Sequence, residues 1–326
     1  MMLESREKIR KVPTSVIIFM CLLLAAMAIP VFGDQAIVGL TTKILIFGLF
    51  AMSLDILVGY TGLLSFGHAV LSGAASYTTA ILLTRFDIAS FWITAPASIL
   101  IAFVVACVFG FISLRVSGLY FLLVTLALGQ AAFHTTIHLR EFFGGESGIG
   151  GIPYPPFCDS PTSFFYFVLL VCFACFISLY IFTKSSFGYS LQGIREDEVR
   201  MKCLGYNVWL HKYIVFMISG LFAGISGLLY VHYNGLMTPS SISIEGNGLP
   251  WLMLIIGGSG TLWGALLGSG IIFILQYFIS SWIPLRWPLL IGICFVSAVL
   301  FARGGILVSI REFLRSKKKV IRNEHS

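Results

Sequence analysis

Polar residues that could do chemistry are scarce in this sequence, and they lie inside long apolar segments. They comprise one acid, one amide and three histidines: Asp55, His68, Gln130, His134 and His138. An ionisable group within a membrane segment is a candidate for proton transfer, because lipid disfavours an unpaired charge. Asp55 and His138 lie near segment ends, where water or headgroups can solvate them. Polar packing is therefore the simpler interpretation, with a proton-coupled role as the alternative.

The sequence lacks the motifs of common enzyme classes. It has no GxxxxGK[ST] phosphate loop, no HExxH zinc motif, no GxSxG nucleophile motif and no His/Cys cluster at metal-ligand spacing. A chain without a phosphate loop is not expected to hydrolyse nucleotides. We therefore predict that this protein is not an enzyme, that it binds no cofactor itself and that it has no catalytic residue or metal site.

Composition indicates a membrane protein. Of 326 residues, 58% are hydrophobic and only 11% are charged, whereas soluble domains carry about 25% charged residues. The net charge is +7, and the basic residues gather in the N-terminal tail, at 184–212 and at 303–322, which flank apolar stretches. This pattern is typical of cytoplasmic segments of membrane proteins. Without a basic groove interleaved with aromatic residues, nucleic acid is not an expected partner.

The elements that must position the polar residues are membrane helices of about 20 residues. Stretches of sufficient length run over 15–32, 37–58, 63–84, 91–114, 118–138, 163–183, 213–233, 261–280 and 288–302. The stretch 249–258 is short. Basic tails at both ends place both termini in the cytoplasm, which requires an even number of crossings. We predict a single all-α polytopic bundle over residues 1–326 with about ten spans, or eight if 249–258 and 261–280 form one broken helix.

Three segments lie outside the predicted spans. Residues 139–162 are rich in Gly and Pro and form an outer loop rather than a span. Residues 184–212 form a charged inner loop, in which a short helix over Leu191–Leu204 has Ile194, Met201 and Leu204 on one apolar side. Gly205 would end that helix, since glycine easily adopts positive φ. Residues 307–326 form a basic cytoplasmic tail.

Small residues are frequent in two of the predicted spans. They are Gly62, Ser65, Gly67 and Gly73 around the third span, where His68 follows directly, and Gly260 and Gly264 near the start of 261–280. Small side chains let membrane helices approach closely. They can also expose backbone to a translocation path, and the sequence alone leaves both roles open.

Five short motifs carry a family resemblance. They are Gly59-Tyr-Thr-Gly62 with Ser65-Phe-Gly-His68, Leu114–Phe121 with Val124–Ala127, Gly193–Glu198 with Leu204–Asn207, Gly257–Gly264, and Phe301–Gly305. In this order they resemble the permeases of ATP-binding-cassette importers for branched-chain amino acids. The similarity is to the shorter-loop, LivM-like subunit of the usual permease pair, and it covers about residues 44 to 307.

The resemblance implies a heteromeric importer in the bacterial inner membrane. Its partners would be a second homologous permease, two ATP-binding-cassette ATPases that bind ATP and Mg, and an extracytoplasmic substrate-binding protein. The ATPase would dock on the inner loop at Arg195, Glu196, Asp197, Glu198, Leu204 and Gly205. The translocation path or its close helix packing would use Gly62, Ser65, Gly67, His68, Gly73, Thr125, Gln130, Gly260 and Gly264.

Two points limit what the resemblance implies. Asp55 stands where the family usually has an uncharged polar residue, typically Asn, and the inner loop lacks the glutamate-alanine-alanine pattern of other importers. The implied substrates are leucine, isoleucine and valine, and related permeases carry urea or short amides. A proton-coupled secondary transporter is the alternative from another class, although Asp55 is the one carboxylate within the spans that could serve it.

Overall fold

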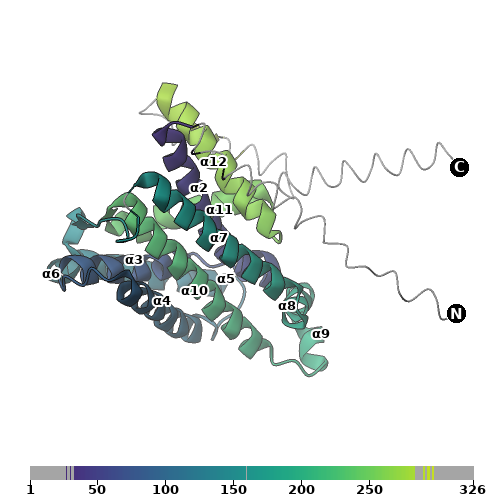
Figure 1. Ribbon diagram of the computed structural model, residues 1–326. Helices are drawn as coiled ribbons and strands as arrows, with labels where there is room; N and C mark the ends of the chain where they lie inside the picture. Colours follow the sequence, from purple (N-terminus) through teal and green to yellow (C-terminus); the bar gives the residue numbers. More distant parts are fainter. Residues whose placement is uncertain are drawn as a thin grey trace, which may run out of the picture.

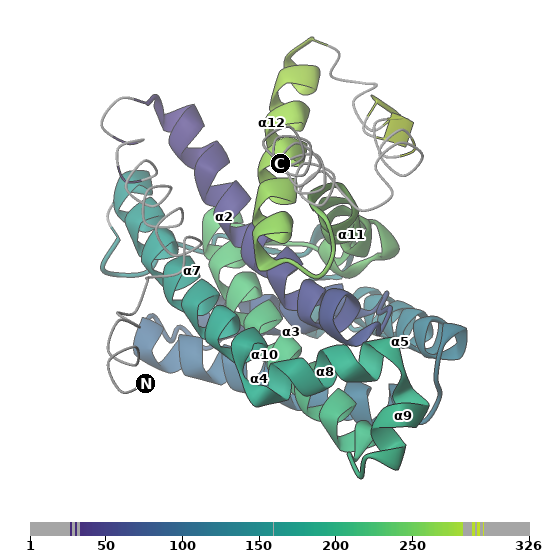
Figure 2. The same cartoon turned by 90° about the vertical axis from the view of Figure 1, so that its right-hand side faces the viewer.

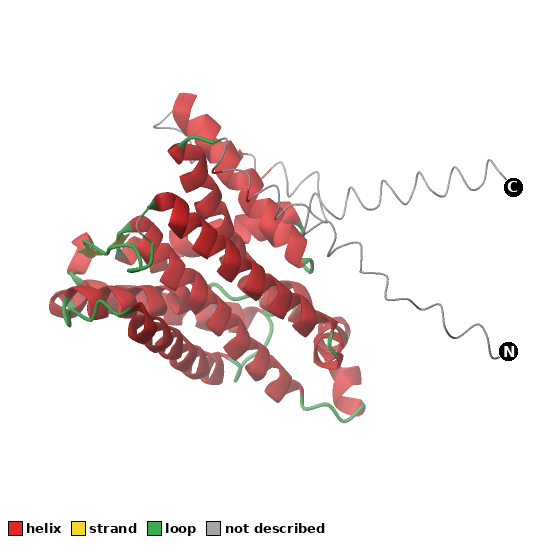
Figure 3. Cartoon of the chain, viewed as in Figure 1, coloured by secondary structure: helices red, strands yellow, loops and turns green. Residues whose placement is uncertain are grey.

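The computed structural model of the chain describes residues 33–158 and 160–282, together with Met27, Pro30 and five positions between 289 and 296. Helices dominate these residues, and short loops join them (Figure 3). The predicted stretches 15–32 and 288–302 and the tail 307–326 lie wholly or largely outside the described residues. The predicted all-α bundle is confirmed for the part of the chain that the structure describes.

The first half of the bundle contains four long helices. They are α2 (Gln35–Asp55), α3 (His68–Thr84), α4 (Phe91–Ser113) and α5 (Leu119–His138). A five-residue π-helical turn, η1 (Ile56–Tyr60), extends α2 without a gap. Each helix is apolar on most of its surface, as expected for an element surrounded by lipid and other helices.

The second half contributes α7 (Pro161–Lys184), α10 (Val208–Asn234), α11 (Ile244–Gly257) and α12 (Leu262–Trp282). Side-chain caps define where several of them begin. Ser160 accepts a hydrogen bond from the amide of Ser163 at the start of α7, and Asn207 accepts one from the amide of Leu210 at the start of α10. Such caps satisfy amides that the first helical turn leaves without a partner.

Short elements lie at both ends of the bundle. The loop end carries α6 (Arg140–Phe143), η2 (Gly145–Ser147), η3 (Pro239–Ile242) and a two-stranded antiparallel ladder, in which β1 (Ile149–Gly150) pairs with β2 (Leu236–Met237). The opposite end, called the junction end below, carries α8 (Ser186–Glu196) and α9 (Glu198–Cys203). Figure 1 shows α6 and α9 at opposite ends of the molecule. Residues 139–162 form no span, as predicted.

Helix α10 lies at the centre and packs against α2, α3 and α4, while α12 packs against α2 and α11 (Figure 2). Small residues allow this close approach. A Cβ atom at Gly220 would lie 2.3 Å from the Cβ of Ala106 on α4, and one at Gly227 would lie 2.0 Å from the carbonyl oxygen of Ser72 on α3. The packing therefore depends on small side chains, as in other membrane bundles.

Six helices among the described residues are long and apolar enough to cross a membrane: Gln35–Tyr60, Phe91–Ser113, Leu119–His138, Pro161–Lys184, Val208–Asn234 and Leu262–Ser281. Each corresponds to a predicted span. The protein is therefore a multi-pass membrane protein, and the prediction of ten or eight crossings remains a prediction because both terminal stretches lie outside the described residues.

Two predicted spans differ from the structure. The stretch 63–84 is helical only from His68, and residues 62–67 before it are irregular backbone. The stretch 249–258 belongs to α11, a separate helix of 14 residues. At 1.5 Å per residue it is about 21 Å long, which is shorter than the ~30 Å hydrocarbon core of a bilayer. It is joined to α12 by a turn at residues 258–261.

Candidate functional site

The break segment, residues 62–67, is non-helical backbone inside the bundle. It connects the end of η1 to the start of α3, where His68 contacts Ser53 in α2 and Ser219 in α10. Both serines lie several residues inside their membrane helices. Irregular backbone at this depth occurs in membrane proteins where it is buried in protein or lines a cavity, and interrupted helices are typical of transporter binding sites.

Side chains from other helices satisfy the backbone of the break segment. The amide of Phe66 donates to Oγ1 of Thr125 at 3.1 Å, and Nε1 of Trp251 donates to the carbonyl oxygen of Ser65 at 3.0 Å. The amide of Ala69, in the first turn of α3, donates to Oδ1 of Asn247 at 2.7 Å. Thus α5 and α11 together hold the segment, and each bond replaces one that a continuous helix would make internally.

Two glycines make the course of the segment possible. Gly62 has φ +74°, which an L side chain rarely adopts. A Cβ atom on Gly67 would lie 2.3 Å from the backbone carbonyl oxygen of Thr125. Gly62 is therefore required for its positive φ and Gly67 for a close approach, and the prediction of a helical span from residue 63 is wrong for Ser65 and Gly67.

His68 and Ser65 are completely buried next to the break segment. The Nε2 atom of His68 lies 2.9 Å from Oγ of Ser53 and 3.4 Å from Oγ of Ser219. Its ring stacks on Phe50, with centroids 5.5 Å apart. Nε2 of His68 thus has two hydroxyl partners, while Nδ1 of His68 and Oγ of Ser65 have no partner among the described residues.

A second cluster, the junction, lies where η1, α8 and the 258–261 turn meet. Oδ1 of Asp55 accepts a hydrogen bond from the amide of Gly260 at 2.7 Å. The guanidinium of Arg195, at the end of α8, donates to the carbonyl oxygen of Gly59. A Cβ atom on Gly59 would lie 2.2 Å from both Asp55 Oδ1 and Gly260 N, so the contact is possible only with glycine.

The expectation that water or headgroups solvate Asp55 is wrong. Asp55 is fully buried, because α11, α12 and the 258–261 turn cover the end of α2. Arg195 acts on it electrostatically, and its Oδ2 atom has no partner among the described residues. The carboxylate thus ties the turn between α11 and α12 to the end of α2.

The inner-loop residues form two helices rather than one. The predicted helix over Leu191–Leu204 is interrupted at Asp197, whose φ and ψ of −154° and 99° are extended and whose side chain caps α9 through the amide of Arg200. Ile194 and Met201 are buried with Val208, but Leu204 is 66% exposed. The prediction that Ile194, Met201 and Leu204 lie on one apolar side is therefore wrong for Leu204, because the chain turns at Asp197. As predicted, the helix ends before Gly205, which has φ +87°.

Glu198 connects α9 to the start of α10. Its carboxylate lies 2.6 Å from Nζ of Lys212 and 3.2 Å from Nζ of Lys202. Partial burial of Glu198 would raise its pKa, but the hydrogen bonds and charges of Lys212 and Lys202 outweigh this effect, so the pKa is lowered from its ordinary value of 4.5. The charged form of Glu198 therefore stabilises the position of α9.

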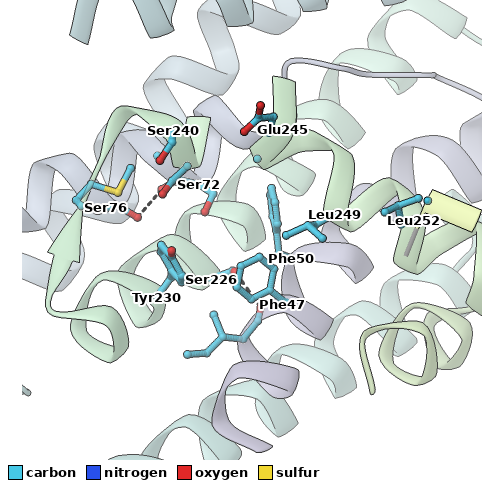
Figure 4. A pocket seen from close by; sticks show the side chains of 16 residues that line it. Phe47, Phe50, Ser72, Ser76, Ser226, Tyr230, Ser240, Glu245, Leu249 and Leu252 are labelled. Carbon is cyan, nitrogen blue, oxygen red and sulfur yellow. Dashed lines mark hydrogen bonds between the residues drawn. The ribbon is translucent and has the colours of Figure 1, made fainter. Parts of the chain in front are cut away.

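A cavity of about 700 Å³ lies between α2, α3, α10 and α11. Phe47, Phe50 and Tyr230 form its aromatic wall, and Ser72 and Ser226 are among its hydroxyl residues (Figure 4). This volume is within the range of small-molecule sites in proteins. Aromatic walls with a few hydroxyl groups suit a small, largely apolar solute.

Two smaller cavities flank the bundle. One of about 530 Å³, at the loop end, is lined by Gln130 of α5 and residues of η3 and α11. The other, of about 460 Å³, lies at the junction end, and Gly59, Arg195 and Gly260 line it. Gly73 lines the 700 Å³ cavity, and a Cβ atom there would lie 1.9 Å from Cγ2 of Ile242.

Comparison with known proteins places these features in a family. Residues 36–302 match the family described as "Branched-chain amino acid transport system / permease component". The chain belongs to this permease family. No solved structure matches the chain.

Individual relatives agree with the family match. The branched-chain amino acid permease LivM of Salmonella typhimurium is 24% identical over 94% of this chain and 78% of its own length, and the E. coli LivM shows the same values. LivH of S. typhimurium is 21% identical over 80% of this chain and 91% of its own length. The guanosine permease NupQ of Bacillus subtilis is 29% identical over 37% of this chain and 43% of its own length.

The break segment and the junction contain some residues that the sequence predicted and others that it did not. The structure brings together Gly62, Ser65, Gly67, His68 and Thr125 at the break segment and Arg195 with Gly260 at the junction. Gln130 lies apart at the loop end, and Gly264 packs against the backbone of Gly258. Asn247 and Trp251 were missed, although a polar and an amphipathic side chain within a short apolar stretch could have indicated contacts to exposed backbone.

Proposed function

We propose that this chain is one of two permease subunits of an ATP-driven importer and that it forms part of the translocation path for branched-chain amino acids. The observation that carries this proposal is the family match over residues 36–302. The interrupted helix at residues 62–67 and the 700 Å³ cavity, whose lining residue Phe50 stacks on His68, support it, because a solute must cross the bilayer beside backbone and small polar groups. The loop end would face outward and the junction end inward.

The proposed partners supply what this chain lacks. Two ATP-binding-cassette subunits would bind ATP and Mg and dock on the inner side, a homologous permease would complete the path, and a soluble binding protein would deliver substrate from outside. The exposed Leu204 and the exposed charges of α8 and α9 support an inner docking surface. Arg195 supports coupling, because it links this surface directly to Gly59 beside the break segment.

The similarity to the guanosine permease makes a nucleoside the second candidate, and the family resemblance adds urea or a short amide as further alternatives. A proton-coupled transporter is less well supported. Asp55 is already engaged with the amide of Gly260, which is a structural task, and the described residues hold no second carboxylate beside it.

The test is uptake by the complete transporter reconstituted with its partner chains in proteoliposomes. We expect ATP-dependent accumulation of labelled leucine, isoleucine or valine, with a stoichiometric ATPase that copurifies with this chain. Uptake that needs a proton gradient and no ATPase would contradict the transporter class. ATP-driven uptake of guanosine or urea in place of the amino acids would contradict the substrate.

A further inference from the structure

One acidic residue stands at the mouth of the 700 Å³ cavity. Glu245, in the first turn of α11, is exposed and is the only charged residue among the described residues that line the cavity. Within the described part of the chain, its carboxylate forms no ion pair and no side-chain hydrogen bond. The other described lining residues of this cavity are apolar, aromatic or hydroxyl-bearing, and Glu146 is a second acid in the lining of the neighbouring cavity beside α5.

Glu245 also belongs to the neighbouring cavity of about 530 Å³ beside α5, and the two cavities share Ser240 and Glu245. In Figure 4, Glu245 and Ser240 lie at one end of the larger cavity, while Tyr230 and Phe47 lie toward the other. A solute that moves from the loop end into the bundle therefore passes the carboxylate before it reaches the aromatic wall.

The fold itself does not require this carboxylate. The start of α11 is already capped by Ser243, whose Oγ accepts hydrogen bonds from the amides of Glu245 and Gly246. An acid near a helix N-terminus is favourable, but this effect is small at an exposed position. No basic residue among the described lining residues neutralises the acid, so its chemistry would suit a cationic group.

We propose that Glu245 binds the ammonium group of the transported solute and thereby selects for compounds with a primary ammonium on a compact apolar body. The inference deepens the proposed function, on which it rests, because it excludes neutral nucleosides, urea and amides as preferred cargo. The apolar body packs against Phe47, Phe50 and Tyr230. The hydroxyl of Ser72, which lacks a partner among the described residues, is available to a carboxylate on the same solute.

The first test is transport by the reconstituted complex. For Glu245→Gln we expect the maximal rate of leucine uptake to fall about tenfold or more, as loss of one partner of a charge pair does. ATP hydrolysis stimulated by the binding protein should change less than about twofold, since the junction is untouched. Glu245→Asp should retain most uptake, and Glu141→Gln, at an exposed glutamate outside both cavities, should match the wild type.

The second test needs no transport. A Ser72→Cys reporter, in a complex without the native cysteines of this chain, is labelled with a small thiol reagent. We expect 3-methylbutylammonium to slow labelling, whereas the neutral 3-methylbutanol should not. Glu245→Gln should abolish the protection. A complex that keeps only Cys203, which is exposed at the junction end, should show no protection by either compound.

The outcomes separate the inference from the proposed function. Unchanged uptake by Glu245→Gln, or equal protection by the alcohol and the ammonium compound, would overturn the role of Glu245 while leaving an amino acid importer intact. Failure of the wild type to import any amino acid would refute the proposed substrate. The protection assay would then still decide whether Glu245 binds an ammonium group.

Discussion

The charged residues at the two ends of the bundle differ in their burial and in their hydrogen-bond partners. At the junction, Asp55 is fully buried and bonded to the amide of Gly260, and Arg195 is bonded to the carbonyl oxygen of Gly59. At the loop end, Glu245 is exposed without an ion pair among the described residues. Both ends contain acids near helix termini, but only one of these acids is part of the packing.

This difference matches the two proposed roles, in which the junction couples ATP hydrolysis to transport and the cavity mouth recognises the solute. A buried charge that is hydrogen-bonded to backbone fixes the relative position of two elements, because losing one partner leaves the other unpaired in a low dielectric. An exposed acid beside a cavity is free to bind a ligand. Substitutions at the junction should therefore alter the coupling of ATP hydrolysis to uptake, whereas those at the mouth should alter uptake alone.

The largest effect is expected for Asp55→Leu. The change leaves the amide of Gly260, at a partly buried position, without its acceptor, which costs about 1–3 kcal/mol, and it removes the hydrogen bond between the 258–261 turn and α2. Uptake should be lost, while Asp55→Asn should retain it, since the Asn side-chain oxygen can still accept the hydrogen bond. Both variants are measured for uptake, expression and ATPase activity. Loss of uptake in a well-expressed Asp55→Asn protein would instead support a proton-coupled role.

A strong effect is also expected for Gly67→Ala, in the break segment between the two ends. The new Cβ atom would lie 2.3 Å from a backbone carbonyl oxygen of Thr125, which cannot move without shifting α5. We expect a loss of about 1–3 kcal/mol in stability and a severalfold decrease in uptake. Gly248→Ala on α11 is the matched control, because nothing lies within 4 Å of its Cβ position. Equal melting temperatures of the two variants would refute the close approach.

An intermediate effect is expected for Leu204→Asp on the docking surface. Leu204 is 66% exposed, so the change should leave the folding and insertion of the permease intact. Copurification of the ATPase should decrease severalfold, because a charge replaces an apolar contact in the proposed interface. Leu139→Asp, at a leucine that is 50% exposed at the opposite, loop end of the bundle, serves as the control. Full retention of the ATPase by Leu204→Asp would show that docking does not use this surface.

The smallest effect is expected from the pH dependence at Glu198. Because its folded-state pKa is lowered below 4.5, its ion pairs add stability at neutral pH, and this contribution is lost as pH falls through the folded-state pKa. Glu198→Gln should therefore melt at a slightly lower temperature than the wild type at pH 7, and the difference should shrink as the pH falls below 4.5 and through the folded-state pKa. A difference that persists or grows in acid would contradict this sign.

Sequence reasoning predicted what depends on length and composition. Spans such as Phe91–Ser113 are long apolar runs, and Gly205 ends its helix as glycine commonly does. The break at residues 62–67 could not be predicted, because Ser65 and Gly67 occur equally in closely packed helices. The partner atoms on Thr125, Asn247 and Trp251 are 59 to 186 residues away from the backbone they satisfy. Only the tertiary structure shows these pairs.

Helix α11 has a consequence for how the two ends communicate. It begins with Glu245 at the cavity mouth, holds the break segment through Asn247 and Trp251, and ends at the turn that Asp55 ties to α2. This single helix of 14 residues thus reaches the cavity mouth, the break segment and the junction. If its tilt depends on which partner is bound, thermodynamic linkage makes the influence mutual: a solute that favours one tilt changes the affinity for the ATPase by the same factor as the ATPase changes the affinity for the solute.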